Sequence, residues 1–282
     1  MVRSRAIIAL HAAVALFGFA GLFGTWLALP PAEITLGRAA IAALALAIVA
    51  WARGERAAPS VALLINGAIL AAHWTAFFTA IQVSGVAIGL LGFASFPLFV
   101  VLLERLLLRR PLDRRSMVTV VLVTAGLMLI AATRSGAASP IAGLAWGVAA
   151  GATFAWLAVR NRAHVRNAPA LALALWQNAF AAGWLLPLVL LTPQARAPLA
   201  GEWILIVVLG VACTALAHTL FIASMRTLSA HTASVIAALE PVYGIALAAL
   251  LVHQTPDTAA LAGGLLIVAA AIVASRTLRA RV

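Results

Sequence analysis

The stretch SVALLINGAILAAHWTAFFTAIQ, residues 60–82, decides the class of fold. It runs for 23 residues without Asp, Glu, Lys or Arg. An α-helix needs about 20 mainly apolar residues to cross the hydrocarbon layer of a bilayer. The stretch is therefore predicted to be a membrane-spanning helix.

The rest of the chain has the same character. Hydrophobic residues make up 65% of the 282 residues and charged residues 9%, whereas a soluble domain has about 45–50% apolar and 25% charged residues. Long continuous apolar runs favour helices over the alternating strands of a membrane barrel. We therefore predict an all-α membrane protein with ten transmembrane helices, at residues 6–29, 33–52, 60–82, 85–107, 115–133, 140–160, 169–192, 203–225, 230–252 and 257–276.

The 19 basic residues are all arginines, and their positions predict the topology. With an N-terminus in the cytoplasm, alternating sides place 16 arginines inside and only Arg134 and Arg196 outside, while Arg38 lies within the second span. Cytoplasmic loops of membrane proteins carry such an excess. We therefore expect both termini in the cytoplasm, and the net charge of +12 indicates loop placement rather than a nucleic-acid partner.

An internal repeat divides the predicted spans. His73 precedes Pro97 by 24 residues, and His218 precedes Pro241 by 23, with short turns at Ser84 and Ser229 between them. The pattern predicts two five-helix repeats, residues 1–135 and 136–282. Because each has an odd number of spans, the second would be inverted in the membrane, as in many transporters.

The chain resembles the drug/metabolite transporter superfamily of EamA type. The resemblance rests on Arg38 in Thr35-Leu36-Gly37-Arg38-Ala39, on Pro97 with Glu104-Arg105, and on Leu239-Glu240-Pro241-Val242. Within the superfamily it is most similar to aromatic amino acid exporters of the YddG type, because of the aromatic and His content of the third span. The resemblance implies a multi-pass exporter in the bacterial inner membrane that binds a small-molecule substrate in a central cavity and works by alternating access.

Few ionisable side chains lie deep within the spans, where each is costly unless it has a partner or faces a water-filled cavity. Arg38 could clamp a substrate carboxylate, but a structural tie to backbone carbonyls or to Glu33 is favoured. Glu240 could meet a substrate ammonium, carry a proton or bond neighbouring helices, and Tyr243 lies one turn further along. His73 and His218 could line the cavity from equivalent repeat positions, or each could be an ordinary hydrogen-bonded interior histidine.

Aromatic residues provide candidate walls for a planar or apolar substrate. Helical spacing groups His73 with Phe77 on one face of the third span and Trp74 with Phe78 on the adjoining face, and it places Trp146 and Trp156 on one stripe of the sixth span. The alternative is membrane-interface anchoring. Candidate structural or gating residues are Gly18, Pro97 and Pro241 together with Arg38, and helix packing is the simpler interpretation of Gly18.

Three classes of function are open to a helical membrane protein of this kind: a secondary transporter, an intramembrane enzyme and a channel. The predicted inverted repeat favours a secondary transporter for small amphipathic metabolites, most of all aromatic and other large apolar amino acids, with a multidrug or other metabolite exporter of the same fold as the alternative. An intramembrane enzyme would need paired carboxylates or a nucleophile motif, and a channel would need a filter segment. None of these is visible in the sequence, and no cofactor and no metal site is expected. The protein is expected to act as a monomer in the lipid bilayer.

Overall fold

The computed structural model describes residues 2–55, 58–93, 95–109, 114–132, 139–193, 195–251 and 258–276. All secondary structure in these ranges is helical. The first half contains α1 (Arg3–Trp26), α2 (Pro31–Ala52), α3 (Val61–Phe93), α4 (Phe96–Leu108) and α5 (Arg114–Ala132). The predicted boundary between the repeats, at residues 135 and 136, lies outside the described residues.

The second half begins with α6 (Pro140–His164) and α7 (Ala170–Leu190). The next span is continuous but changes its winding, from α8 (Ala200–Gly210) through the π-helical turn η1 (Val211–Leu216) to α9 (Ala217–Ser224). The chain then forms α10 (Ala230–Ala237), α11 (Glu240–Leu251) and α12 (Thr258–Arg276).

Six helical segments among the described residues are long and apolar enough to cross a membrane: Arg3–Trp26, Pro31–Ala52, Val61–Gly85, Ile141–His164, Ala170–Leu190 and Ala200–Ser224. Large apolar side chains also cover the outer surface, including Leu44, Trp51 and Leu188. An apolar surface of this extent suits contact with lipid rather than water. The chain is a multi-pass helical membrane protein.

The fourth and ninth predicted spans are not single helices, so the predicted ranges 85–107 and 230–252 are wrong as continuous segments. One α-helix ends at Phe93 and the next contains Pro97, while another ends at Ala237 and the next contains Pro241. Proline has no backbone N–H and its ring clashes with the carbonyl four residues earlier. In both spans the preceding helix ends four residues before the proline. The predicted break at Ser84-Gly85 is confirmed, since Gly85 has φ 81° and ψ 165° within α3.

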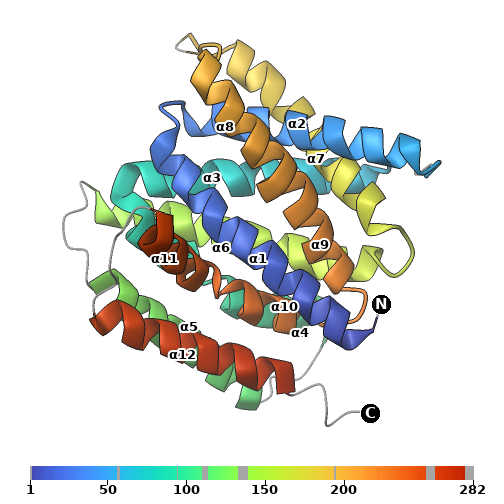
Figure 1. Ribbon diagram of the computed structural model, residues 1–282. Coiled ribbons are helices and arrows are strands. Elements are labelled where there is room, and N and C mark those ends of the chain that lie inside the picture. The colour runs from blue at the N-terminus through green and yellow to red at the C-terminus, as the bar shows by residue number, and fades with distance from the viewer. Residues whose placement is uncertain are drawn as a thin grey trace.

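The helices form a bundle in which distant parts of the chain lie side by side (Figure 1). At one edge α5 packs against α12, and on the opposite side α2 packs against α7 and α8. Between them lie α1, α3, α6 and α9. Gly18 allows α1 to approach α11 closely, because a Cβ atom there would lie 2.8 Å from the Glu240 carbonyl oxygen and 2.9 Å from the Gly244 nitrogen of α11.

Side chains from distant parts of the chain hold two short connections between helices. The α1–α2 connection is held by Gln82 of α3, whose Nε2 donates to the Leu29 carbonyl at 2.9 Å. The α6–α7 connection is held by Arg226, which donates from Nε to the Val165 carbonyl and from Nη2 to the Ala168 carbonyl, both at 3.1 Å. Arg226 therefore contributes two charge-assisted bonds, whereas Gln82 contributes one neutral bond.

Arg196, in the α7–α8 connection, adds a second tie to the α1–α2 connection. Its Nη2 donates to the Ala28 carbonyl at 3.0 Å, and both terminal nitrogens donate to the Glu202 carboxylate at 2.7 and 2.8 Å. The hydrogen bond to Glu202 raises the pKa of Arg196. The Arg196 backbone nitrogen also donates to Glu33 at 3.4 Å.

Candidate substrate cavity

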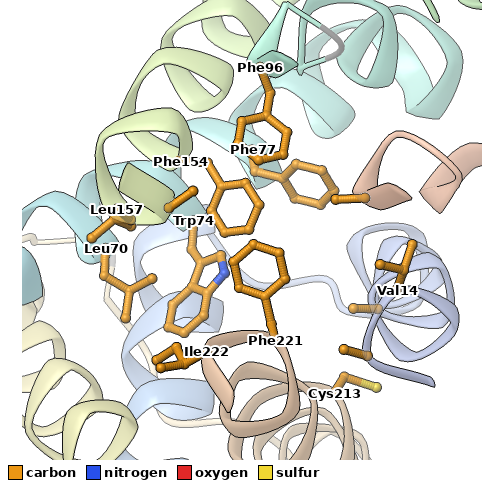
Figure 2. Close-up of a cluster of buried hydrophobic side chains, with 14 of the residues drawn as sticks. Val14, Leu70, Trp74, Phe77, Phe96, Phe154, Leu157, Cys213, Phe221 and Ile222 are labelled. Carbon is orange, nitrogen blue, oxygen red and sulfur yellow. The ribbon is translucent and has the colours of Figure 1, made fainter. Parts of the chain in front are cut away.

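A cavity lies at the centre of the bundle, between α1, α2, α3, α6, α9 and α11. Its lining is mostly aromatic, with two imidazoles, one guanidinium and one carboxylate: Phe17, Ala20, Arg38, Leu70, His73, Trp74, Phe77, Phe93, Phe154, His218 and Glu240. Figure 2 shows Trp74, Phe77, Phe96, Phe154 and Phe221 gathered around this region from four different helices. Both halves of the chain therefore contribute to one site.

The open space in the cavity is small. The cavity volume is about 30 Å³, which is room for roughly two water molecules. The aromatic side chains pack in stacked and edge-on pairs, such as Phe154 with Phe221 at a centroid distance of 5.1 Å. An organic molecule with a ring could enter only if these side chains moved apart.

Arg38 ties the two halves together at the wall of the cavity. Its Nε donates to Thr214 Oγ1 at 2.9 Å and its Nη2 donates to the Cys213 carbonyl at 3.3 Å. Both acceptors belong to the π-helical turn, and π-turns inside α-helices often mark functional sites. The predicted tie to a backbone carbonyl is present, whereas the alternative partner Glu33 is bonded to Arg196 instead.

The face of Trp74 supports the Arg38 guanidinium, which lies 4.2 Å from the ring centroid. The Phe78 ring centroid lies 5.5 Å from the same guanidinium, and Phe78 is not part of the cavity lining. Such cation–π contacts contribute more when the cation is desolvated. Arg38 is only 2% exposed, so the contact is of this kind.

Glu240 brings the opposite charge to the cavity. It is the first residue of α11, next to the helix interruption, and it is 6% exposed. Its carboxylate makes no hydrogen bond or ion pair with the described residues, although Arg38 is near enough to act on it electrostatically. The cavity therefore holds a tied cation and an uncommitted carboxylate within an aromatic wall.

The two predicted histidines both reach the cavity and are both buried. His73 donates from Nδ1 to the Ala150 carbonyl at 2.9 Å, and its ring stacks on Phe154 with centroids 4.8 Å apart. His218 accepts at Nδ1 from the Asn178 side-chain amide at 3.3 Å, and its ring meets Trp74 edge-on at 5.9 Å.

Other predicted residues lie outside the cavity wall. Trp146 is 46% exposed on the outer surface of α6, and Trp156 is partly buried, but neither is part of the lining. Tyr243 bonds to His11, with its hydroxyl 2.7 Å from Nδ1. Gly18 lies at the contact between α1 and α11. Pro97 and Pro241 are buried at the helix interruptions.

The sequence interpretation missed Phe17, Phe93, Phe154 and Thr214. Helical spacing gave no signal for Phe154, because Trp146, Ala150 and Phe154 are spaced four residues apart along α6. Of these three residues, Phe154 lines the cavity and Ala150 accepts the His73 hydrogen bond, whereas Trp146 is exposed. Thr214 had no signal, since its partner Arg38 is 176 residues away.

Comparisons with known proteins show the family to which the chain belongs. The profile of the EamA-like transporter family matches residues 4–132 and residues 141–276. An uncharacterized transporter of Bacillus subtilis (strain 168), YxxF, is 24% identical over 265 residues, which cover 90% of this chain and 84% of that protein. Family and relative both indicate a transporter rather than an enzyme.

A solved crystal structure whose description names no function has the same fold. It superposes with a TM-score of 0.82 at 21% identity and covers 98% of this chain and 98% of that chain. Together with the family match over nearly the whole sequence, this similarity extends to the complete bundle. The chain belongs to the EamA-like transporter family.

Proposed function

We propose that this protein is a secondary transporter that exports aromatic and other large apolar amino acids from a bacterial cell. The observation that carries the proposal is the composition of the central cavity, where a guanidinium and a carboxylate lie within one aromatic wall. A zwitterion with an apolar side chain presents the complementary groups, a carboxylate, an ammonium and a surface that can stack. The cavity would have to widen to accept it.

Alternating access between two inverted five-helix repeats is part of the same proposal. Three features support it: the family profile matches two consecutive segments, the fourth and ninth spans are both interrupted before a proline, and spans five positions apart pack together, as α2 does on α7 and α5 on α12. Discontinuous helices at matching positions of two halves are typical of transporter binding sites. The distribution of the arginines supports a location in the inner membrane with both termini in the cytoplasm.

Counterflow in proteoliposomes tests the substrate. Purified protein is reconstituted with unlabelled amino acid inside, and uptake of labelled phenylalanine, tyrosine, tryptophan and leucine is followed against labelled glutamate and lysine. We expect exchange of the aromatic and branched apolar amino acids and little exchange of the charged ones. Absence of exchange for every apolar amino acid would exclude the proposed substrate class.

One observation favours a second candidate, an exporter of organic cations of the same fold. Glu240 has no hydrogen-bonding or ion-pair partner among the described residues, whereas Arg38 is held by two hydrogen bonds, so a ligand with only a positive charge would also be satisfied. The same liposomes are therefore tested with a labelled aromatic cation. Exchange of the cation without exchange of any amino acid would select this candidate.

A further inference from the structure

The hydrogen bonds around His218 fix the position of its proton. Asn178 Nδ2 donates to the Ala174 carbonyl at 2.8 Å and lies 3.3 Å from His218 Nδ1. An amide nitrogen only donates, so Nδ1 of His218 must accept, and the neutral ring carries its proton on Nε2. The reversed amide would place an oxygen against the Ala174 carbonyl, which excludes it.

The resulting Nε2–H group of His218 lacks a partner. It is buried, and no described residue accepts a hydrogen bond from it, while the whole residue is 1% exposed. A buried donor without an acceptor is destabilising. Because His218 lines the cavity, a ligand that brings an acceptor there would remove this deficit.

His73 has the opposite arrangement. Its Nδ1 donates to the Ala150 carbonyl, so the proton is on Nδ1 and the Nε2 lone pair is left as an acceptor. Protonation of Nε2 would place a second cation in the cavity that already contains the Arg38 guanidinium, which the low dielectric of the site disfavours.

The two imidazoles also lie in different surroundings. His218 meets Trp74, and the same indole carries the Arg38 guanidinium, so a donor and a cation converge around one ring. His73 is stacked on Phe154 and contacts Phe93 and Phe77 at centroid distances of 5.8 and 6.4 Å. The first environment suits an anionic group and the second suits the ring of a ligand.

We propose that His218 and Arg38 bind the carboxylate of the cargo, and that His73 accepts a hydrogen bond from an N–H or O–H group on the cargo's ring. This assignment rests on the proposed function and narrows it. It makes the transporter selective, within aromatic amino acids, for rings that carry a donor, so that tryptophan and tyrosine are preferred over phenylalanine. Glu240 is left for the ammonium group.

Three probes and two matched variants test the assignment. L-Tryptophan has both a ring N–H and a carboxylate, 1-methyl-L-tryptophan lacks the ring donor, and tryptamine lacks the carboxylate. His73→Asn and His218→Asn each keep a polar atom at the Nδ1 position, for the framework hydrogen bond, and remove the group at Nε2. Trp146→Phe, on the outer surface of α6, is the control variant. Dissociation constants are measured by competition against labelled tryptophan on purified protein whose folding is checked by gel filtration and thermal melting.

The wild type is expected to bind tryptophan about 5- to 10-fold more tightly than its 1-methyl derivative, the effect of one neutral hydrogen bond. His73→Asn should remove this difference. His218→Asn should weaken the binding of tryptophan by about 10-fold or more, because the acceptor is the charged carboxylate. It should leave the binding of tryptamine, which lacks the carboxylate, nearly unchanged. Trp146→Phe should bind all three probes as the wild type does.

Each other outcome has a defined meaning. If the wild type binds tryptophan and 1-methyl-tryptophan with equal affinity, the assignment of His73 is overturned. This comparison uses the wild type alone, so it can be made even when a variant fails to fold. If His218→Asn reduces the affinity for tryptamine as much as the affinity for tryptophan, the assignment of His218 is overturned. In both cases the proposed function stands. A wild type that binds none of the three probes overturns the assignment, and the counterflow panel of apolar amino acids then decides separately whether the proposed function stands.

Discussion

The two interrupted spans, α3 with α4 and α10 with α11, are both broken just before a proline, but the side chain that precedes the proline differs. In the first, Phe96 precedes Pro97, is almost fully buried, and stacks on Phe93 with centroids 5.7 Å apart. In the second, Glu240 precedes Pro241 and lines the cavity without a hydrogen-bonding partner among the described residues. Equivalent positions therefore carry a packed ring in one half and an uncommitted carboxylate in the other.

This difference shows that the shared framework and the charge of the site can be separated. Proline ends the preceding helix in both halves, because it cannot accommodate the carbonyl four residues earlier. The charges, by contrast, are divided between the halves: Arg38 comes from the first half and is tied to η1 in the second, and Glu240 comes from the second half alone. The first two predictions concern the charges and the last two the framework.

The largest effect is expected at Arg38. Arg38→Lys keeps the charge but loses the hydrogen bonds to Thr214 and Cys213 and the planar contact with Trp74. Two charge-assisted bonds are each worth about 1.5–3 kcal/mol, and lysine cannot reproduce the fork of arginine. We expect stability to fall by about 2–4 kcal/mol, measured by denaturation in detergent. Arg5→Lys, at an exposed position of α1, should change it by less than about 0.5 kcal/mol.

Glu240→Gln should reduce counterflow of the preferred amino acid by about 10- to 100-fold, because a charge-assisted bond to the substrate ammonium is worth about 1.5–3 kcal/mol. The side chain keeps its size, so the melting temperature should not fall. Phe96→Leu, at the equivalent position of the first half, is the control and should mainly lower stability. Equal loss of flux in both variants would contradict the division of roles between the two interruptions.

Much of the framework could be predicted from the sequence. Apolar length identified the membrane helices, and the Ser84-Gly85 turn was located correctly because glycine there adopts a positive φ. The inward faces were harder to predict. A membrane helix is apolar on the lipid side as well as on the protein side, so periodicity did not distinguish Phe154, which lines the cavity, from Trp146, which does not.

The partners of the charged residues were harder still to predict. Arg38 was recognised as a buried cation, but its acceptors lie on a π-helical turn that no local sequence pattern predicts. The nearer carboxylate, Glu33, was the obvious partner in sequence and is instead bonded by the α7–α8 connection. The scarcity of charge therefore pointed to Arg38 and Glu240, which both line the cavity, whereas the partners of such residues depend on contacts between the two halves.

A glycine contact between α1 and α11 offers a test of the framework. Gly18→Ala places a methyl group 2.8 Å from the Glu240 carbonyl oxygen, so α1 and α11 must separate. Overpacking of this kind destabilises by about 1–3 kcal/mol. Gly244→Ala, on the other side of the same contact, meets only an ordinary contact at 3.5 Å and should be neutral or slightly stabilising. Thermal melting in detergent compares them, and equal destabilisation by the two substitutions would contradict the packing described.

The smallest effects are expected where the two helix connections are held. Gln82→Ala removes one neutral bond to the α1–α2 connection, and Arg226→Ala removes two charge-assisted bonds to the α6–α7 connection. A neutral bond contributes about 0.5–1.5 kcal/mol, and Arg196 still holds the first connection through Ala28. Gln82→Ala should therefore lower the melting temperature less than Arg226→Ala. Arg196 still holds the α1–α2 connection when Gln82 is replaced. The double substitution Gln82→Ala, Arg196→Ala should therefore lower the melting temperature by more than the sum of the two single substitutions. Strict additivity would show that Gln82 and Arg196 stabilise the connection independently.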